Sequence, residues 1–115
     1  MDYHAHVYWT TAEQKSLAVA MRARLLNMGY RVGRLHDEPV GPHPVGQFQV
    51  IYTTGDQAIV ERVCRDMRGD ASVLLHEAIN DDVRDHTEGA RWLGEPLRLD
   101  LEWLENYIRN KQNAH

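Results

Sequence analysis

Apolar and polar positions alternate in the first residues of the chain. Within the aromatic, β-favouring run from Tyr3 to Trp9, the small and apolar Ala5 and Val7 alternate with His4 and His6. This period of two predicts a strand whose faces differ, with Ala5 and Val7 toward a core and both histidines on the opposite face.

Two later segments have helical spacing. After Thr10, which forms a predicted capping box with Glu13, apolar residues recur every three to four positions until Gly29: Leu17, Met21, Leu25 and Met28. Residues 56–68 repeat this pattern before Gly69, with Ile59, Val60, Val63 and Met67 on one face. Both segments are predicted to be amphipathic helices that pack on a sheet.

Three further strands are predicted from β-favouring runs at residues 30–36, 47–53 and 72–76. Prolines and glycines between residues 37 and 46 indicate a stiff loop. The order β-α-β-β-α-β is that of the ferredoxin-like split βαβ fold, an α+β architecture with two helices on one face of an antiparallel sheet. We therefore expect a single domain over residues 1–115.

The C-terminal part is expected to add one helix to this fold. Residues 80–95 are polar and predicted to be irregular, whereas Asp100 can cap a helix that carries Leu101, Leu104 and Ile108. Residues 111–115 are expected to fray.

Composition narrows the function classes. The net charge of -4, with scattered basic residues, gives no footprint for nucleic acid. No apolar run approaches the length of a membrane span, no secretory signal precedes the first strand, and the single cysteine, Cys64, is expected in the core. We expect a cytoplasmic protein that binds neither nucleic acid nor membrane.

The histidines carry the candidate chemistry. In the predicted fold the strand at 72–76 is antiparallel to the first, which places His76 beside His4 and His6. His43 in the 37–46 loop and His86 after the fourth strand leave from the same edge of the sheet. Neutral imidazoles bind iron, zinc and copper, so this corner is predicted to hold a metal ion.

Other polar residues could complete the site. Tyr8, Arg34, Gln47 and Gln49 are expected on the open sheet face, where they could contact a polar substrate, and Trp92 could wall a pocket. Acidic residues nearby could supply a third ligand or orient imidazoles, although solvated loop charges explain them equally well: Asp37, Glu38, Glu77, Asp81, Asp82 and Asp85.

The sequence resembles the small DOPA 4,5-dioxygenase family over nearly its whole length. The resemblance rests on separated motifs in the right order: residues 3–8 (YHAHVY), 40–44 (VGPHP), 75–76 (LH), 85–87 (DHT) and 92–94 (WLG). It implies a ferredoxin-like fold and a non-haem iron(II) centre that performs extradiol cleavage of a catechol, such as DOPA or a related compound, with O2 as second substrate.

Roles within the centre follow from strand adjacency and from that chemistry. His4, His6 and His76 are the expected metal ligands, with His43 as the first replacement. His43 or His86 is the candidate for proton transfer, a task suited to a group that titrates near neutral pH. Three-histidine and two-histidine-one-carboxylate sites both remain open, because no single carboxylate stands out.

Two other functions fit the same residues. A zinc hydrolase or isomerase could use the histidine pocket, since zinc or another divalent metal accepts three imidazoles and water. A non-enzymatic small-molecule-binding module is also compatible with this fold. Whatever the function, the open sheet face is expected to support a homodimer.

Overall fold

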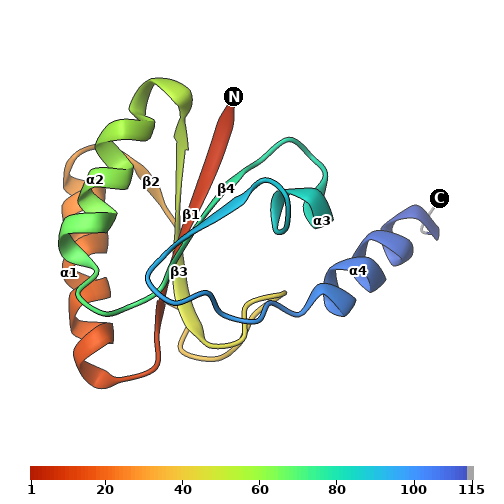
Figure 1. Ribbon diagram of the computed structural model, residues 1–115, viewed down its shortest axis with the longest axis horizontal. Helices are drawn as coiled ribbons and strands as arrows, with labels where there is room; N and C mark the ends of the chain where they lie inside the picture. Colours follow the sequence, from red (N-terminus) through yellow and green to blue (C-terminus); the bar gives the residue numbers. More distant parts are fainter. Residues whose placement is uncertain (114–115) are drawn as a thin grey trace.

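The sheet has five strands, all paired antiparallel, in the order β2-β3-β1-β4-β5. A computed structural model describes residues 1–113 (Figure 1). The strands are β1 (Asp2–Trp9), β2 (Arg31–Val32), β3 (Gly46–Thr53), β4 (Val73–Glu77) and β5 (Ala90–Leu93). The helices are α1 (Ala12–Asn27), a 3₁₀ turn η1 (Thr54–Asp56), α2 (Gln57–Met67), α3 (Asp82–Asp85) and α4 (Leu101–Asn113).

The first four strands with α1 and α2 form the predicted split βαβ unit. Their order β2-β3-β1-β4 places β1 between β3 and β4, and both long helices cover the same face of the sheet (Figure 1). This confirms the α+β, ferredoxin-like class. The other face, toward α3 and the segment that leads into α4, is free of α1 and α2.

The core lies between the sheet and these two helices. Ala5, Val7, Phe48 and Val50 of the central strands are at most 1% exposed. They pack with apolar residues of the helices, which are Ala18, Met21, Leu25, Val60, Val63 and Cys64. Burial of each large side chain in this core contributes about 1.5–3 kcal/mol to the stability of the fold. The opposite face of the sheet is not needed for this core and can carry polar, functional side chains.

The prediction of an irregular segment at residues 80–95 was wrong. It contains the short helix α3 and the edge strand β5, whose Trp92 lies opposite Leu74 of β4. A four-residue strand spans too few positions for its alternation of side chains to be recognised in a polar segment. Strand β5 forms because the edge of β4 is free to pair with it.

Other element boundaries also moved. Thr11, and not Thr10, caps α1: its Oγ1 accepts a hydrogen bond from the backbone N–H of Gln14 (3.1 Å), because the chain stays extended through Thr11. The expected strand at 30–36 shortens to Arg31–Val32, since the ladder breaks after Gly33 and returns only as a bridge between His36 and Gln47.

The last helix begins as predicted. The Asp100 carboxylate accepts a hydrogen bond from the backbone N–H of Trp103 (2.9 Å), and α4 extends away from the sheet (Figure 1). Lys111 to Asn113 are helical instead of frayed, and the remaining two residues of that prediction, 114 and 115, lie outside the described residues. Among residues 1–113, no helix has the length and apolarity needed to cross a membrane.

Candidate metal centre

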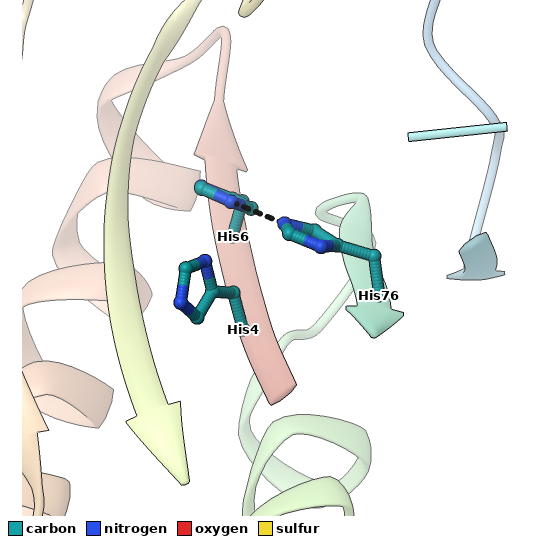
Figure 2. Close-up of side chains that lie close together, drawn as sticks. All are labelled: His4, His6 and His76. Carbon is teal, nitrogen blue, oxygen red and sulfur yellow. Dashed lines mark hydrogen bonds between the residues drawn. The ribbon is translucent and has the colours of Figure 1, made fainter. Parts of the chain in front are cut away.

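Strands β1 and β4 bring three histidines together on the sheet face opposite α1 and α2. His4 and His6 share that face because they are two residues apart, and His4 is the register partner of His76. Figure 2 shows the rings of His6 and His76 directed at one another, with His4 alongside. The Nε2 atoms of His6 and His76 are 3.0 Å apart, and one nitrogen from each of the three rings lies within 4.8 Å of the others.

Two further histidines complete the cluster. His43 comes from the loop between β2 and β3, and His86 follows α3 directly. The ring centroids of His6 and His43 are 4.1 Å apart, and those of His76 and His86 are 4.3 Å apart. His6, His43 and His86 form a second group with nitrogens within 4.8 Å. All five histidines singled out from the sequence therefore meet, and His6 belongs to both groups.

Four of the five rings are anchored from outside the cluster through Nδ1. The hydrogen bonds are His6 to Gln47 Oε1 (2.9 Å), His76 to the Glu77 carbonyl (2.7 Å), His86 to the Asp82 carbonyl (2.6 Å) and His43 to the Tyr8 hydroxyl (2.7 Å). Metal-binding histidines are held in this manner, because a second partner orients the ring and selects its tautomer. Among residues 1–113, His4 has no such partner.

Burial keeps the imidazoles of His6, His43 and His76 neutral. Desolvation lowers the pKa of His76 to about 3 and that of His43 to about 4, and it holds the pKa of His6 well below its ordinary value of 6.5. Positive charge on neighbouring histidines would lower the pKa of His6 and His43 further. At neutral pH the rings of His6, His43 and His76 are therefore in the uncharged form that binds metal ions.

The contact between His6 and His76 fits a bound cation. Each ring donates its Nδ1 hydrogen to an oxygen, so each Nε2 carries a lone pair, and the two lone pairs face each other at 3.0 Å. This contact could become a hydrogen bond only if one of the two imidazoles gained a second proton. That ring would then carry a positive charge, which burial disfavours. Two nitrogens about 2.1 Å from one ion and at about a right angle to each other would be roughly 3.0 Å apart.

Four of the six acidic residues considered from the sequence have hydrogen-bond or ion-pair partners outside the histidine cluster. Glu77 pairs with Arg84 (2.7 Å), Asp37 pairs with Lys15 (2.5 Å), and Asp81 caps α3. Asp85 is buried and accepts a hydrogen bond from the backbone N–H of Ile79. The two candidate ligand groups among the described residues consist of histidines alone.

Two cavities are lined in part by histidines of the cluster. The smaller, of ≈ 270 Å³, is lined by His6, His43, Gln47 and the predicted substrate contacts Arg34 and Gln49. The larger, of ≈ 570 Å³, is lined by His86, the predicted contact Trp92, and Leu97 to Glu102. Either volume could accommodate a single aromatic ring with a short side chain.

Tyr8 is placed differently from the other predicted substrate contacts. Its side chain is 1% exposed, its hydroxyl contacts His43, and its ring stacks on Trp92 with centroids 5.8 Å apart. Sequence reasoning did not identify Arg98, which lines the larger cavity. No sequence pattern marks Arg98 as a cavity residue, because it lies in the irregular stretch before α4, and the path of that stretch depends on tertiary packing.

Comparisons with known proteins identify the family to which the chain belongs. The sequence model of the Dopa 4,5-dioxygenase family matches residues 3–103. An uncharacterized 21.2 kDa protein of Botryotinia fuckeliana is 32% identical over 99% of this chain and 67% of its own length. A DOPA 4,5-dioxygenase of Amanita muscaria is 27% identical over 87% of this chain, which spans only 48% of that relative.

A solved structure shares the fold. A crystal structure from Nostoc punctiforme, described as a "putative dioxygenase", superposes with a TM-score of 0.86 at 33% identity and covers 92% of both chains. With the family match over residues 3–103, these similarities show that the chain belongs to the Dopa 4,5-dioxygenase family, a family of oxidoreductases.

Proposed function

We propose that this protein is a metal-dependent extradiol dioxygenase that cleaves the ring of a catechol, DOPA or a related compound, with O2. The observation that carries the proposal is the buried contact between His6 and His76, whose two Nε2 lone pairs face each other at 3.0 Å. The name of the Amanita muscaria relative supports the substrate class.

The proposed ligands are His4, His6 and His76. His6 and His76 are favoured by their facing nitrogens, and His4 by its place beside them on β1. His86 competes with His4 for the third position, because its ring is anchored through Nδ1 and that of His4 is not. Fe(II) bound here would supply adjacent positions at which a catechol and O2 are held together.

The remaining side chains would bind the substrate and handle its protons. His43 and His86 are the proposed acid-base residues, and burial keeps His43 uncharged at neutral pH. Arg34 and Gln49 in the smaller cavity could contact polar groups of the substrate, and Trp92 in the larger cavity could contact the ring. Each cavity is lined by at least one histidine of the cluster, so a catechol bound in either would displace water beside that histidine.

The test is anaerobic loading of chelator-treated protein with Fe(II), followed by a panel of catechols and then O2. We expect a yellow ring-cleavage product with the wild-type protein and none with His6→Ala. Parallel His4→Ala and His86→Ala variants identify the third ligand, since loss of a ligand should weaken metal binding by more than the roughly ten- to hundredfold that loss of a ligand's hydrogen-bond partner costs. No product from any catechol with iron-loaded protein would contradict the proposal.

A zinc hydrolase or isomerase is the second candidate. It is favoured by one observation, that the candidate ligand groups are all imidazole, a donor set that zinc accepts readily. Zinc-loaded protein serves as the matched comparison in the same assay. Dioxygenase activity predicts that only iron supports O2 consumption, whereas substrate turnover with zinc in the absence of O2 would favour the second candidate.

A further inference from the structure

Of the four oxygen atoms within residues 1–113 that anchor the histidine cluster, the Tyr8 hydroxyl is the one that carries a hydrogen to donate. It lies 2.7 Å from Nδ1 of His43, and the Tyr8 ring is held in place by its stack on Trp92. The side chain is 1% exposed, and within residues 1–113 the hydroxyl has His43 as its hydrogen-bond partner and no other. The hydroxyl hydrogen of Tyr8 is therefore either donated to His43 in a hydrogen bond or left without an acceptor.

The direction of this hydrogen bond follows from the cost of the alternative. If the His43 Nδ1–H donated to the hydroxyl, the buried O–H hydrogen of Tyr8 would lack an acceptor, which is unfavourable for a polar group out of contact with water. The ordinary pKa of a tyrosine hydroxyl is about 10, so the hydroxyl keeps its proton at neutral pH. The Tyr8 O–H accordingly donates to Nδ1, and a neutral imidazole that accepts at Nδ1 carries its own hydrogen on Nε2.

The three other anchored histidines have the opposite tautomer. Their partners are oxygens that only accept, since Gln47 is oriented with Oε1 toward His6 and backbone carbonyls face His76 and His86. These rings carry hydrogen on Nδ1 and a lone pair on Nε2, which is the form that binds a metal or accepts a proton. His43 alone among the four presents an N–H at Nε2.

We propose that Tyr8 is a positioning residue that holds His43 as the Nε2–H tautomer, which makes His43 a hydrogen-bond donor at the centre and excludes it as a metal ligand. The tautomer of His43 is inferred from the hydrogen bonds alone, whereas its role as a donor to the substrate rests on the proposed function. A neutral N–H beside the reacting groups stabilises an oxygen that becomes negatively charged, without itself losing the proton. Acceptance of a catechol proton then belongs to a ring with a free lone pair, such as His86.

Nitrogen-15 NMR reads the tautomer directly and does not require activity. In zinc-loaded and metal-free wild-type protein, two-bond correlations between ring hydrogens and nitrogens, assigned with His43→Gln, should show His43 as Nε2–H. In Tyr8→Phe, which keeps the ring and its contact with Trp92, that preference should be lost. Nδ1–H in the wild-type protein, or an unchanged tautomer in Tyr8→Phe, would overturn the proposal, and the wild-type spectrum decides it even if the variant does not fold.

Tyr52→Phe is the matched control. Tyr52 is another buried tyrosine, 3% exposed, but it belongs to the hydrophobic core, where its ring stacks on Tyr3, and its hydroxyl has no hydrogen-bond partner among the described residues. Removing that hydroxyl should leave the His43 tautomer as in the wild type. A tautomer change in Tyr52→Phe equal to that in Tyr8→Phe would show a general effect of buried hydroxyl loss and would overturn the specific role of Tyr8.

Kinetics and metal binding form the second arm. With iron-loaded Tyr8→Phe we expect kcat to fall roughly tenfold, and in His43→Gln roughly a hundredfold, with the metal dissociation constant changed less than about threefold in both. A ten- to hundredfold loss of metal affinity in His43→Gln would identify His43 as a ligand and overturn the proposal. If iron-loaded wild-type protein cleaves no catechol, the proposed function fails, while the NMR result still decides the tautomer.

Discussion

Acidification should destabilise the metal-free protein through its buried histidines. Folding lowers the pKa of His43 from 6.5 to about 4 and that of His76 from 6.5 to about 3, chiefly by desolvation. The unfolded chain therefore binds protons that the folded chain does not. Stability from these two groups is complete above pH 6.5 and is lost as the pH falls toward the folded-state values.

The size of the effect follows from the same two values. Between about pH 7.5 and about pH 5, each histidine contributes a loss of about 2 kcal/mol, or about 4 kcal/mol for both. His6, whose pKa burial also lowers, adds to this loss. Domains of this size are typically stable by about 5–15 kcal/mol, so the change should be large enough to shift the whole unfolding transition.

The assay is urea unfolding followed by circular dichroism, after removal of metal with a chelator. We compare the wild-type protein with His43→Gln and His76→Gln at both pH values, since glutamine keeps polarity but does not titrate. Each substitution should reduce the pH-dependent loss by about 2 kcal/mol, whatever it does to stability at neutral pH. Equal unfolding free energies of the wild type at both pH values, or an undiminished pH-dependent loss in both variants, would refute the reasoning.

Three further changes test the packing around the site. Leu75→Ala removes a side chain that is 1% exposed in β4 and should lower the unfolding free energy by about 2–5 kcal/mol in urea titrations; a loss below about 1 kcal/mol would contradict the assigned core. Gly46→Ala places a Cβ 2.5 Å from Nε1 of Trp9 and should cost about 1–3 kcal/mol with a shifted Trp fluorescence, whereas unchanged stability and emission would show that this contact is absent. Asp100→Ala removes the cap of α4 and should speed amide hydrogen exchange in its first turn, corresponding to about 1 kcal/mol; exchange equal to the wild type would argue against the cap.

Much of the site could be predicted because its main parts follow from strand periodicity and connectivity. The alternation of His4 and His6 with Ala5 and Val7 settled which side chains share a face, and antiparallel pairing of β1 with β4 brought His76 to them. Both relations depend only on a strand's period of two and on the chain order, which the sequence carries directly.

The rest depended on distances that no local pattern encodes. The roles of Gln47 and Tyr8 as anchors require the register of β3 on β1 and the path of the loop that carries His43. Strand β5 forms only because β4 leaves an edge free. The sequence could not distinguish Thr10 from Thr11 as the cap of α1, because both residues have the same hydroxyl group. The point at which the extended chain after β1 ends decides between them.

The most direct test of iron-dependent ring cleavage is the stoichiometry of O2 uptake during catechol turnover by iron-loaded protein. An oxygen electrode and absorbance of the product are read together, with catalase present to reveal any hydrogen peroxide. The proposed function predicts one O2 consumed per ring cleaved, no peroxide, and loss of both signals in His6→Ala. Catechol oxidation with peroxide release, or turnover without O2 uptake, would contradict it.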